Sequence, residues 1–254
     1  MKFDIHSPCA QLQPYIKHLA ISENETETSY RIIPDTALVL GFQYRGSLAY
    51  LEQNKQIALA ATGVTGLLDT ARTFQNSASI GSVLVVFKEC RAASFLRTPL
   101  HEIFGESLSL EHFFHPDDFI ALQERLALAD GDRARIDLVE TFLIAHLHEQ
   151  KIDLLVNGAL TYINQSKGTI RIKDLAALLN TSASPLEKRF RQLVGASPKK
   201  FASIVRARSV IAAIERGDDD QTDHLSAFYD QAHFIKEFKK FTSFTPEQYM
   251  KSLR

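Results

Sequence analysis

Residues 172–201 constrain the fold of this chain more than any other stretch, because their apolar side chains recur at helical spacing around one short break. A first helix should end near Asn180. Ser182 is then well placed to cap a second helix, since its hydroxyl can accept a hydrogen bond from a first-turn N–H. The second helix should bury a stripe formed by Leu186, Phe190 and Leu193. Two short helices joined by a turn predict a helix-turn-helix, although a small amphipathic hairpin without a special function gives much the same pattern.

The same unit recurs after a shift of 48 positions, and this duplication favours a helix-turn-helix over a plain hairpin. The shift pairs Ser182 with Asp230, Leu186 with Phe234, Lys188 with Lys236, Phe190 with Phe238, Arg191 with Lys239 and Ser197-Pro198 with Thr245-Pro246. The Ser/Thr-Pro pair in each copy indicates a further helix start, because proline suits the first helical turn. Two such units side by side can present two outward helices to one face of DNA.

Charge is divided unevenly along the chain, although the net charge is only −1. Residues 154–254 carry 16 lysines and arginines against 10 aspartates and glutamates, a net charge of +6. Residues 1–153 carry 13 against 20, a net charge of −7. A basic C-terminal half joined to an acidic N-terminal half is typical of a DNA-binding module with a separate sensor.

Residues 155–254 resemble the paired helix-turn-helix domain of the AraC/XylS-type transcriptional regulators. The segments that carry the resemblance are LEKRFRQLVGASPKKF at 186–201 and FYDQAHFIKEFKKFTSFTPEQY at 228–249. The second segment is the more specific, because a polar loop, a capped helix, Phe-x3-Phe and Thr-Pro must occur in that order. The resemblance implies a bacterial regulator of transcription that binds double-stranded DNA sequence-specifically.

The resemblance also implies an α+β domain organisation. Residues 1–150 are expected to form a β-rich, cupin-like sensor domain that becomes helical towards its end. Residues 151–254 are expected to form an all-α DNA-binding domain with two helix-turn-helix units, at about 151–201 and 202–254. One long helix over residues 197–215 should bridge the two units and fix their spacing.

Matching the family motif onto this sequence gives candidate DNA contacts, with residues 183–192 as the first recognition helix. Base contacts are expected from Ser184, Glu187 and Lys188 in the first unit and from Gln231, Ala232, Ile235 and Lys236 in the second. Lys188 can donate to guanine O6 and N7, and Glu187 can accept from cytosine N4. Phosphate contacts are expected from Arg191, Lys199, Lys200, Arg206, Lys239 and Lys240. The pattern leaves the role of Arg189 open.

The second unit departs from the first in its supporting helix. Asp223, His224 and Ala227 stand where the first unit has Leu175, Ala176 and Leu179. The acidic run Asp218–Asp220 repels phosphate, and Ser243 replaces Gly195 in the following turn. A recognition helix reads bases only where its neighbour holds it firmly in the groove. We therefore predict that the first unit reads bases, while the second mainly contributes phosphate contacts.

The N-terminal half shows β-rich patterns first and helical patterns later. Short β-branched or aromatic runs between Tyr30 and Phe87 predict a small sandwich or barrel. Pro116 should open a helix, and residues 134–150 form a strongly amphipathic one. The latter helix can pair with its twin in a homodimer or merely pack on its own sensor domain.

Other chemistry finds little support in the sequence. Cys9 and Cys90 are typical of reduced cytosolic thiols, no apolar run approaches the ~20 residues of a membrane span, and the N-terminus has no signal-peptide core. We therefore expect a cytoplasmic protein. The nine histidines do not form a convincing metal site, and phosphate-loop or nucleophile motifs do not occur. We expect no metal, no cofactor and no enzymatic activity.

Three alternatives stay open at this point. The chain can be a cupin-type metal enzyme with a vestigial DNA-binding module. It can act on a partner protein through a degenerate second unit. It can also bind DNA without a small-molecule effector.

Overall fold

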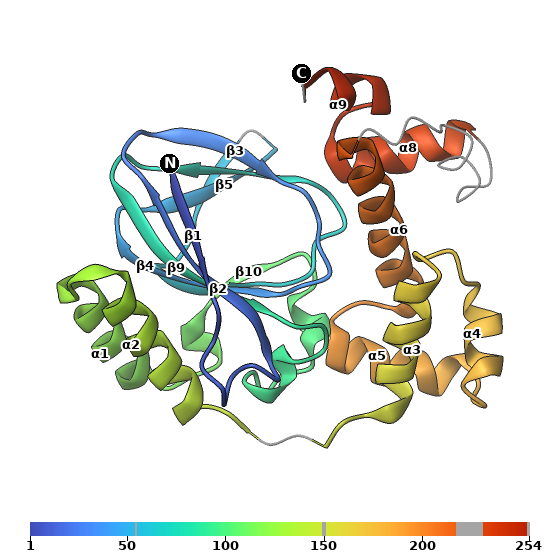
Figure 1. Ribbon diagram of the computed structural model, residues 1–254, viewed down its shortest axis with the longest axis horizontal. Coiled ribbons are helices and arrows are strands. Elements are labelled where there is room, and N and C mark those ends of the chain that lie inside the picture. The colour runs from blue at the N-terminus through green and yellow to red at the C-terminus, as the bar shows by residue number, and fades with distance from the viewer. Residues whose placement is uncertain (54, 149–150, 217–230, 253–254) are drawn as a thin grey trace.

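The structure is a computed structural model that describes residues 1–53, 55–148, 151–216 and 231–252. A β-rich N-terminal part is followed by helices, which confirms the predicted fold class (Figure 1). The supporting helix expected within residues 216–230 lies, apart from Arg216, outside the described residues, as does the expected cap Asp230.

A six-stranded antiparallel sheet in the order β1-β2-β9-β4-β7-β10 forms one layer of the N-terminal part. Its strands are β1 Lys2–His6, β2 Ile16–Asn24, β4 Val39–Arg45, β7 Thr62–Thr65, β9 Ile80–Phe87 and β10 Ser107–Ser109. Strand β2 pairs along its whole length with β9. Residues 2–6 and 16–24 are therefore an integral part of the sheet.

A four-stranded antiparallel sheet in the order β3-β8-β5-β6 forms the second layer. Its strands are β3 Thr28–Ile32, β5 Leu48–Glu52, β6 Lys55–Ala58 and β8 Arg72–Asn76. Side chains alternate across β4 as the strand pleat requires. Leu40 and Phe42 are fully buried in the main hydrophobic core, while Val39, Gly41 and Gln43 line a cavity that residues of both sheets enclose.

Two helices, α1 Pro116–Leu128 and α2 Gly131–Ala145, cover one face of the six-stranded sheet (Figure 1). Pro116 begins α1 as predicted. The Phe142 ring of α2 meets the Phe42 ring of β4 edge-on at 5.8 Å. Because Phe142 and Leu143 are buried here, much of the apolar face of α2 packs within the chain itself.

Short 3-10 turns and a helical C-terminal part complete the fold. The turns are η1 Ala92–Ser94, η2 Leu100–Ile103 and η3 Leu110–His112. The C-terminal helices are α3 Leu154–Gln165, α4 Ile172–Leu178, α5 Ala183–Val194, α6 Pro198–Glu215, α8 Gln231–Thr242 and α9 Pro246–Ser252. Helix α6 confirms the predicted long helix. Its start is fixed by Pro198 and by the Ser197 hydroxyl, which accepts from Lys200 N at 3.2 Å.

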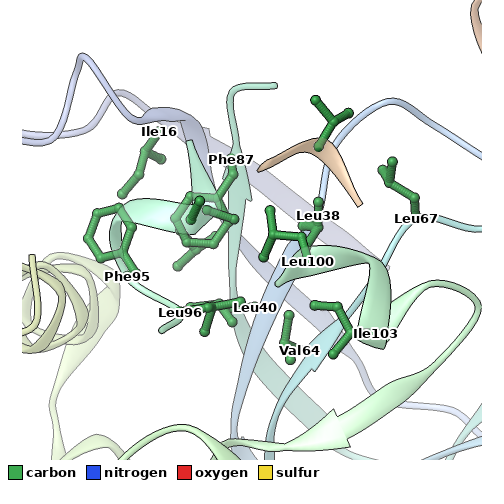
Figure 2. Packing of buried hydrophobic residues seen from close by; sticks show 14 of the residues in the cluster. Ile16, Leu38, Leu40, Val64, Leu67, Phe87, Phe95, Leu96, Leu100 and Ile103 are labelled. Atoms are coloured by element: carbon green, nitrogen blue, oxygen red, sulfur yellow. The ribbon is translucent and has the colours of Figure 1, made fainter. Parts of the chain in front are cut away.

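One continuous hydrophobic core joins the N-terminal part to the first helix-turn-helix unit. In Figure 2, Leu100 and Ile103 of η2 lie among Leu38, Leu40 and Val64 of the N-terminal part. Helix α5 packs directly against η2 and contributes Leu186, Phe190 and Val194 to the same core. The second unit has a separate small core, which is formed by Val210, Ile211, Phe234, Phe238 and Tyr249.

Candidate nucleic-acid interface

Helices α4 and α5 form the predicted first helix-turn-helix. Helix α4 ends where Asn180 adopts a left-handed conformation with φ 49°, which asparagine tolerates better than most residues. Ser182 is the N-cap residue of α5, with extended backbone angles. The prediction that its hydroxyl accepts a bond from the first turn is wrong, because no side-chain hydrogen bond caps this helix. Ser182 therefore precedes α5 with extended backbone angles and without a side-chain cap.

Helix α5 has one buried and one open face. Leu186 and Phe190 are fully buried, and the Phe190 ring contacts the Phe201 ring of α6 edge-on at 5.6 Å. Val194 continues this stripe, whereas the predicted Leu193 is only half-buried. The stripe therefore follows i, i+4, i+8 spacing and tilts slightly from the predicted line. The three predicted base contacts, Ser184, Glu187 and Lys188, are all exposed on the open face.

Charged neighbours on α5 take part in pairs within the chain. Arg191 faces Glu187 one turn earlier, with 3.8 Å between Nη1 and Oε1. Arg189 donates through Nη2 to Asp153 at 2.6 Å, and Asp153 also caps α3 by accepting from Val156 N at 3.0 Å. Arg189, whose role the sequence left open, thus ties α5 to the start of α3.

The C-terminal end of α5 is seated on the N-terminal part of the chain. Gly195 ends the helix with φ 99°, and a Cβ at this position would lie 3.2 Å from the carbonyl oxygen of Leu100. Only glycine combines this backbone angle with so close an approach at no cost. The contact leaves the N-terminal half of α5, which carries the candidate base contacts, directed away from the β-sandwich.

The phosphate candidates in the first unit differ in their surroundings. Lys199 is exposed at the start of α6. Lys200 is half-buried and donates a hydrogen bond to Asp69, a residue of the N-terminal part. Arg206 is half-buried, its Nη1 lies 3.5 Å from the Gly168 carbonyl, and burial lowers the pKa of its guanidinium. Arg206 is therefore turned towards the protein backbone rather than outward.

Helix α8 resembles α5 in its two faces. Phe234 and Phe238 are buried with ring centres 5.7 Å apart, and Phe238 meets Tyr249 of α9 at the same distance. The outward residues are Ala232, Ile235, Lys236, Lys239 and Lys240, and Gln231 begins the helix. Ser243 adopts φ 66°, so the turn after α8 is left-handed like that at Gly195, although the residue differs.

Asp69 is the functional candidate that the sequence did not indicate. Its carboxylate accepts from Lys200 and from Lys240, the latter at 2.9 Å. The partners are 131 and 171 residues away along the chain, and no local pattern signals such a pairing. Burial favours the neutral acid, but the two lysines outweigh burial and lower the pKa of the Asp69 carboxyl.

Within the described ranges, histidine, cysteine and acidic side chains do not gather in groups of three or more that suit a metal ion. None of the helices in the same ranges is long and apolar enough to cross a bilayer.

A β-rich part of two sheets precedes a helical part that contains the helix-turn-helix of α4 and α5. Residues 175–252 match a family model described as a helix-turn-helix domain, of the AraC type. Residues 4–109 match a domain of unknown function (DUF6597). The chain thus carries an AraC-type helix-turn-helix domain behind an N-terminal domain, which confirms the resemblance.

Two bacterial regulators are similar to this chain in sequence. An uncharacterized HTH-type transcriptional regulator of Haemophilus influenzae is 24% identical over 156 residues, covering 55% of this chain and 52% of that protein. The Msm operon regulatory protein of Streptococcus mutans is 23% identical over 163 residues, covering 60% and 56%. The chain therefore matches only about half the length of these relatives.

Solved structures of ToxT from Vibrio cholerae align with most of this chain. Apo ToxT aligns over 93% of this chain and 97% of its own, with a TM-score of 0.47 and 16% identity. ToxT bound to an unsaturated fatty acid aligns over 91% and 94%, with a TM-score of 0.46 and 14% identity. At these values no residue role transfers from ToxT to this chain.

Proposed function

We propose that this protein is a sequence-specific DNA-binding transcriptional regulator that reads bases through α5. The observation that carries the proposal is the exposed face of α5, where donor and acceptor side chains stand on a helix held by a fully buried stripe. Lys188 suits guanine and Glu187 suits cytosine, while Ser184 can contact either kind of base. In the second unit Gln231, Ala232 and Lys236 are candidate base contacts of lesser weight.

We assign contacts with the phosphates of the DNA backbone to basic residues on these helices and on α6. The candidates are Arg191, Lys199, Lys200, Arg206, Lys239 and Lys240. The inward orientation of Arg206 makes it the weakest of the six. We infer that the second unit holds the backbone mainly through Lys236, Lys239 and Lys240.

The proposal predicts strongly salt-dependent binding. Each phosphate contact contributes about −0.9 to the slope of log K against log salt, so a handful of contacts should give a slope of about −3 to −5. Fluorescence anisotropy of a labelled duplex, titrated at several salt concentrations, measures the slope. A slope indistinguishable from zero would contradict DNA binding and favour action on a partner protein.

We propose that residues 1–150 form a sensor domain with an effector site between the two sheets. Support comes from an apolar cavity of about 270 Å³. Its walls include Tyr30, Ile32 and Phe74 from the four-stranded sheet and Val39, Leu84 and Val86 from the six-stranded sheet. A cavity of this lining suits a small apolar molecule.

Filling the cavity should weaken ligand binding there. A Cβ built on Gly41 would lie 3.8 Å from the Leu84 side chain, so Gly41→Leu extends into the cavity without a backbone clash. We expect about tenfold weaker binding of the apolar dye anilinonaphthalene sulfonate, or ~1.4 kcal/mol, by fluorescence titration. Gln56→Leu, an exposed position on β6, is the matched control. Equal dye binding by both variants would exclude the cavity as the effector site.

A homodimer through residues 134–150 also stays a proposal. Helix α2 buries Ile136, Val139 and Leu143 within the chain, so a partner helix has only the outer face available. That face includes Leu138, which lines a shallow groove together with Leu128, an apolar side chain that is 87% exposed. We also propose that the protein is cytoplasmic and is not an enzyme.

A further inference from the structure

Asp69 lies where the N-terminal part of the chain meets both helix-turn-helix units. It belongs to residues 66–71, which connect β7 of one sheet to β8 of the other. Its carboxylate accepts hydrogen bonds from the ammonium groups of Lys200 on α6 and Lys240 on α8. One acidic side chain thus holds a lysine from each unit.

The backbone around Asp69 is fixed independently of the two lysines. Leu67 and Leu68 are buried, and Leu67 belongs to the core drawn in Figure 2. Gly66 N donates to the Glu106 carbonyl at 3.0 Å, and Gly105 N donates to the Leu67 carbonyl at 2.9 Å. The carboxylate is therefore presented by a rigid segment rather than by a loop that follows the helices.

Further contacts join the N-terminal part to the second unit. The Arg31 guanidinium lies over the Phe244 ring at 4.7 Å, and Asp35 faces Arg208 at 3.7 Å. Ile33 packs against the small core of the second unit. Arg31 lies in β3, and Ile33 and Asp35 follow it closely in the chain. Strand β3 lines the cavity, and so does Thr65, the last residue of β7 before the Asp69 segment.

Lys200 and Lys240 are among the residues assigned to DNA phosphates above. A lysine cannot give the same donors to a carboxylate and to a phosphate, and a carboxylate beside a phosphate is repelled. The side chain of Asp69 is only 21% exposed, so the pair is less screened by solvent than an ordinary surface ion pair.

We propose that Asp69 is an autoinhibitory latch that withholds Lys200 and Lys240 from DNA until the contact opens. The proposal rests on the proposed function, since that function names DNA as the competing anion. The latch acts on phosphate contacts alone, so opening it raises affinity for every duplex and leaves base preference unchanged.

The test compares Asp69→Asn with Glu124→Gln in the full chain. Both substitutions remove one negative charge and keep the side-chain size, but Glu124 is exposed on α1, far from α8 in Figure 1. Anisotropy titration uses a labelled duplex of random sequence at one low salt concentration. Asp69→Asn should bind about threefold to tenfold more tightly than Glu124→Gln, as expected for the loss of two partly screened ion pairs.

Three further measurements make the outcome decisive. Thermal melting verifies that the variants are folded, and Asp69→Ser should reproduce the gain if the lost carboxylate is its cause. In a Lys200→Ala and Lys240→Ala background the gain should vanish. The latch is refuted if Asp69→Asn binds no more tightly than Glu124→Gln, or if the gain survives without the two lysines. If wild type and all variants fail to bind any duplex, the proposed function falls, and the latch falls with it.

Discussion

Replacing Phe190 by alanine is expected to lower the free energy of unfolding by about 3–5 kcal/mol and to abolish DNA binding. The Phe190 side chain is fully buried and packs edge-on against Phe201, so truncation leaves a cavity where α5 rests on the core. Denaturant titration followed by circular dichroism measures the loss.

Leu178→Ala provides the matched comparison for this effect. Leu178 lies on the neighbouring helix α4 with 54% of its surface exposed, so its truncation removes little buried area. It should cost less than about 1 kcal/mol. A loss at Phe190 no larger than that at Leu178 would show that the buried stripe does not hold the recognition helix.

Replacing Lys188 by alanine should cost about 1–3 kcal/mol of binding free energy and relax base preference at one position. Its ammonium is exposed on the open face of α5, where it can donate to a guanine edge. Lys199→Ala should instead weaken all sequences alike, because Lys199 is assigned to a phosphate. Competition titrations with a matched and a scrambled duplex separate the two effects. Equal weakening of both duplexes by Lys188→Ala would exclude base reading.

Local patterns in the sequence predicted the helical part of the fold well. The apolar spacing of Leu186 and Phe190 and the proline at the start of α6 act within one or two helical turns, so a short stretch contains the whole signal. The burial of Val194 in place of Leu193 does not follow from spacing alone. Which of two adjacent apolar residues is buried depends on the partner surface, here η2 of the N-terminal part.

Contacts between segments far apart in the chain could not be predicted from the sequence. The place of β2 beside β9, the cavity between the sheets and the two lysines at Asp69 all depend on how remote segments meet. Exposure of the candidate base contacts on α5 followed from periodicity. The inward orientation of Arg206 could not be predicted from periodicity. A basic side chain on an amphipathic helix is expected to face solvent, and the sequence does not show which neighbour it contacts.

Selection of bound sequences from random duplexes tests the central claim most directly, when wild type is compared with Glu187→Ala and Gln231→Ala. We expect wild type to enrich one motif, Glu187→Ala to change the preferred base at one position, and Gln231→Ala to leave the motif nearly unchanged. The absence of any enriched motif would contradict sequence-specific binding. A change by Gln231→Ala as strong as that by Glu187→Ala would contradict the assignment of base reading mainly to α5.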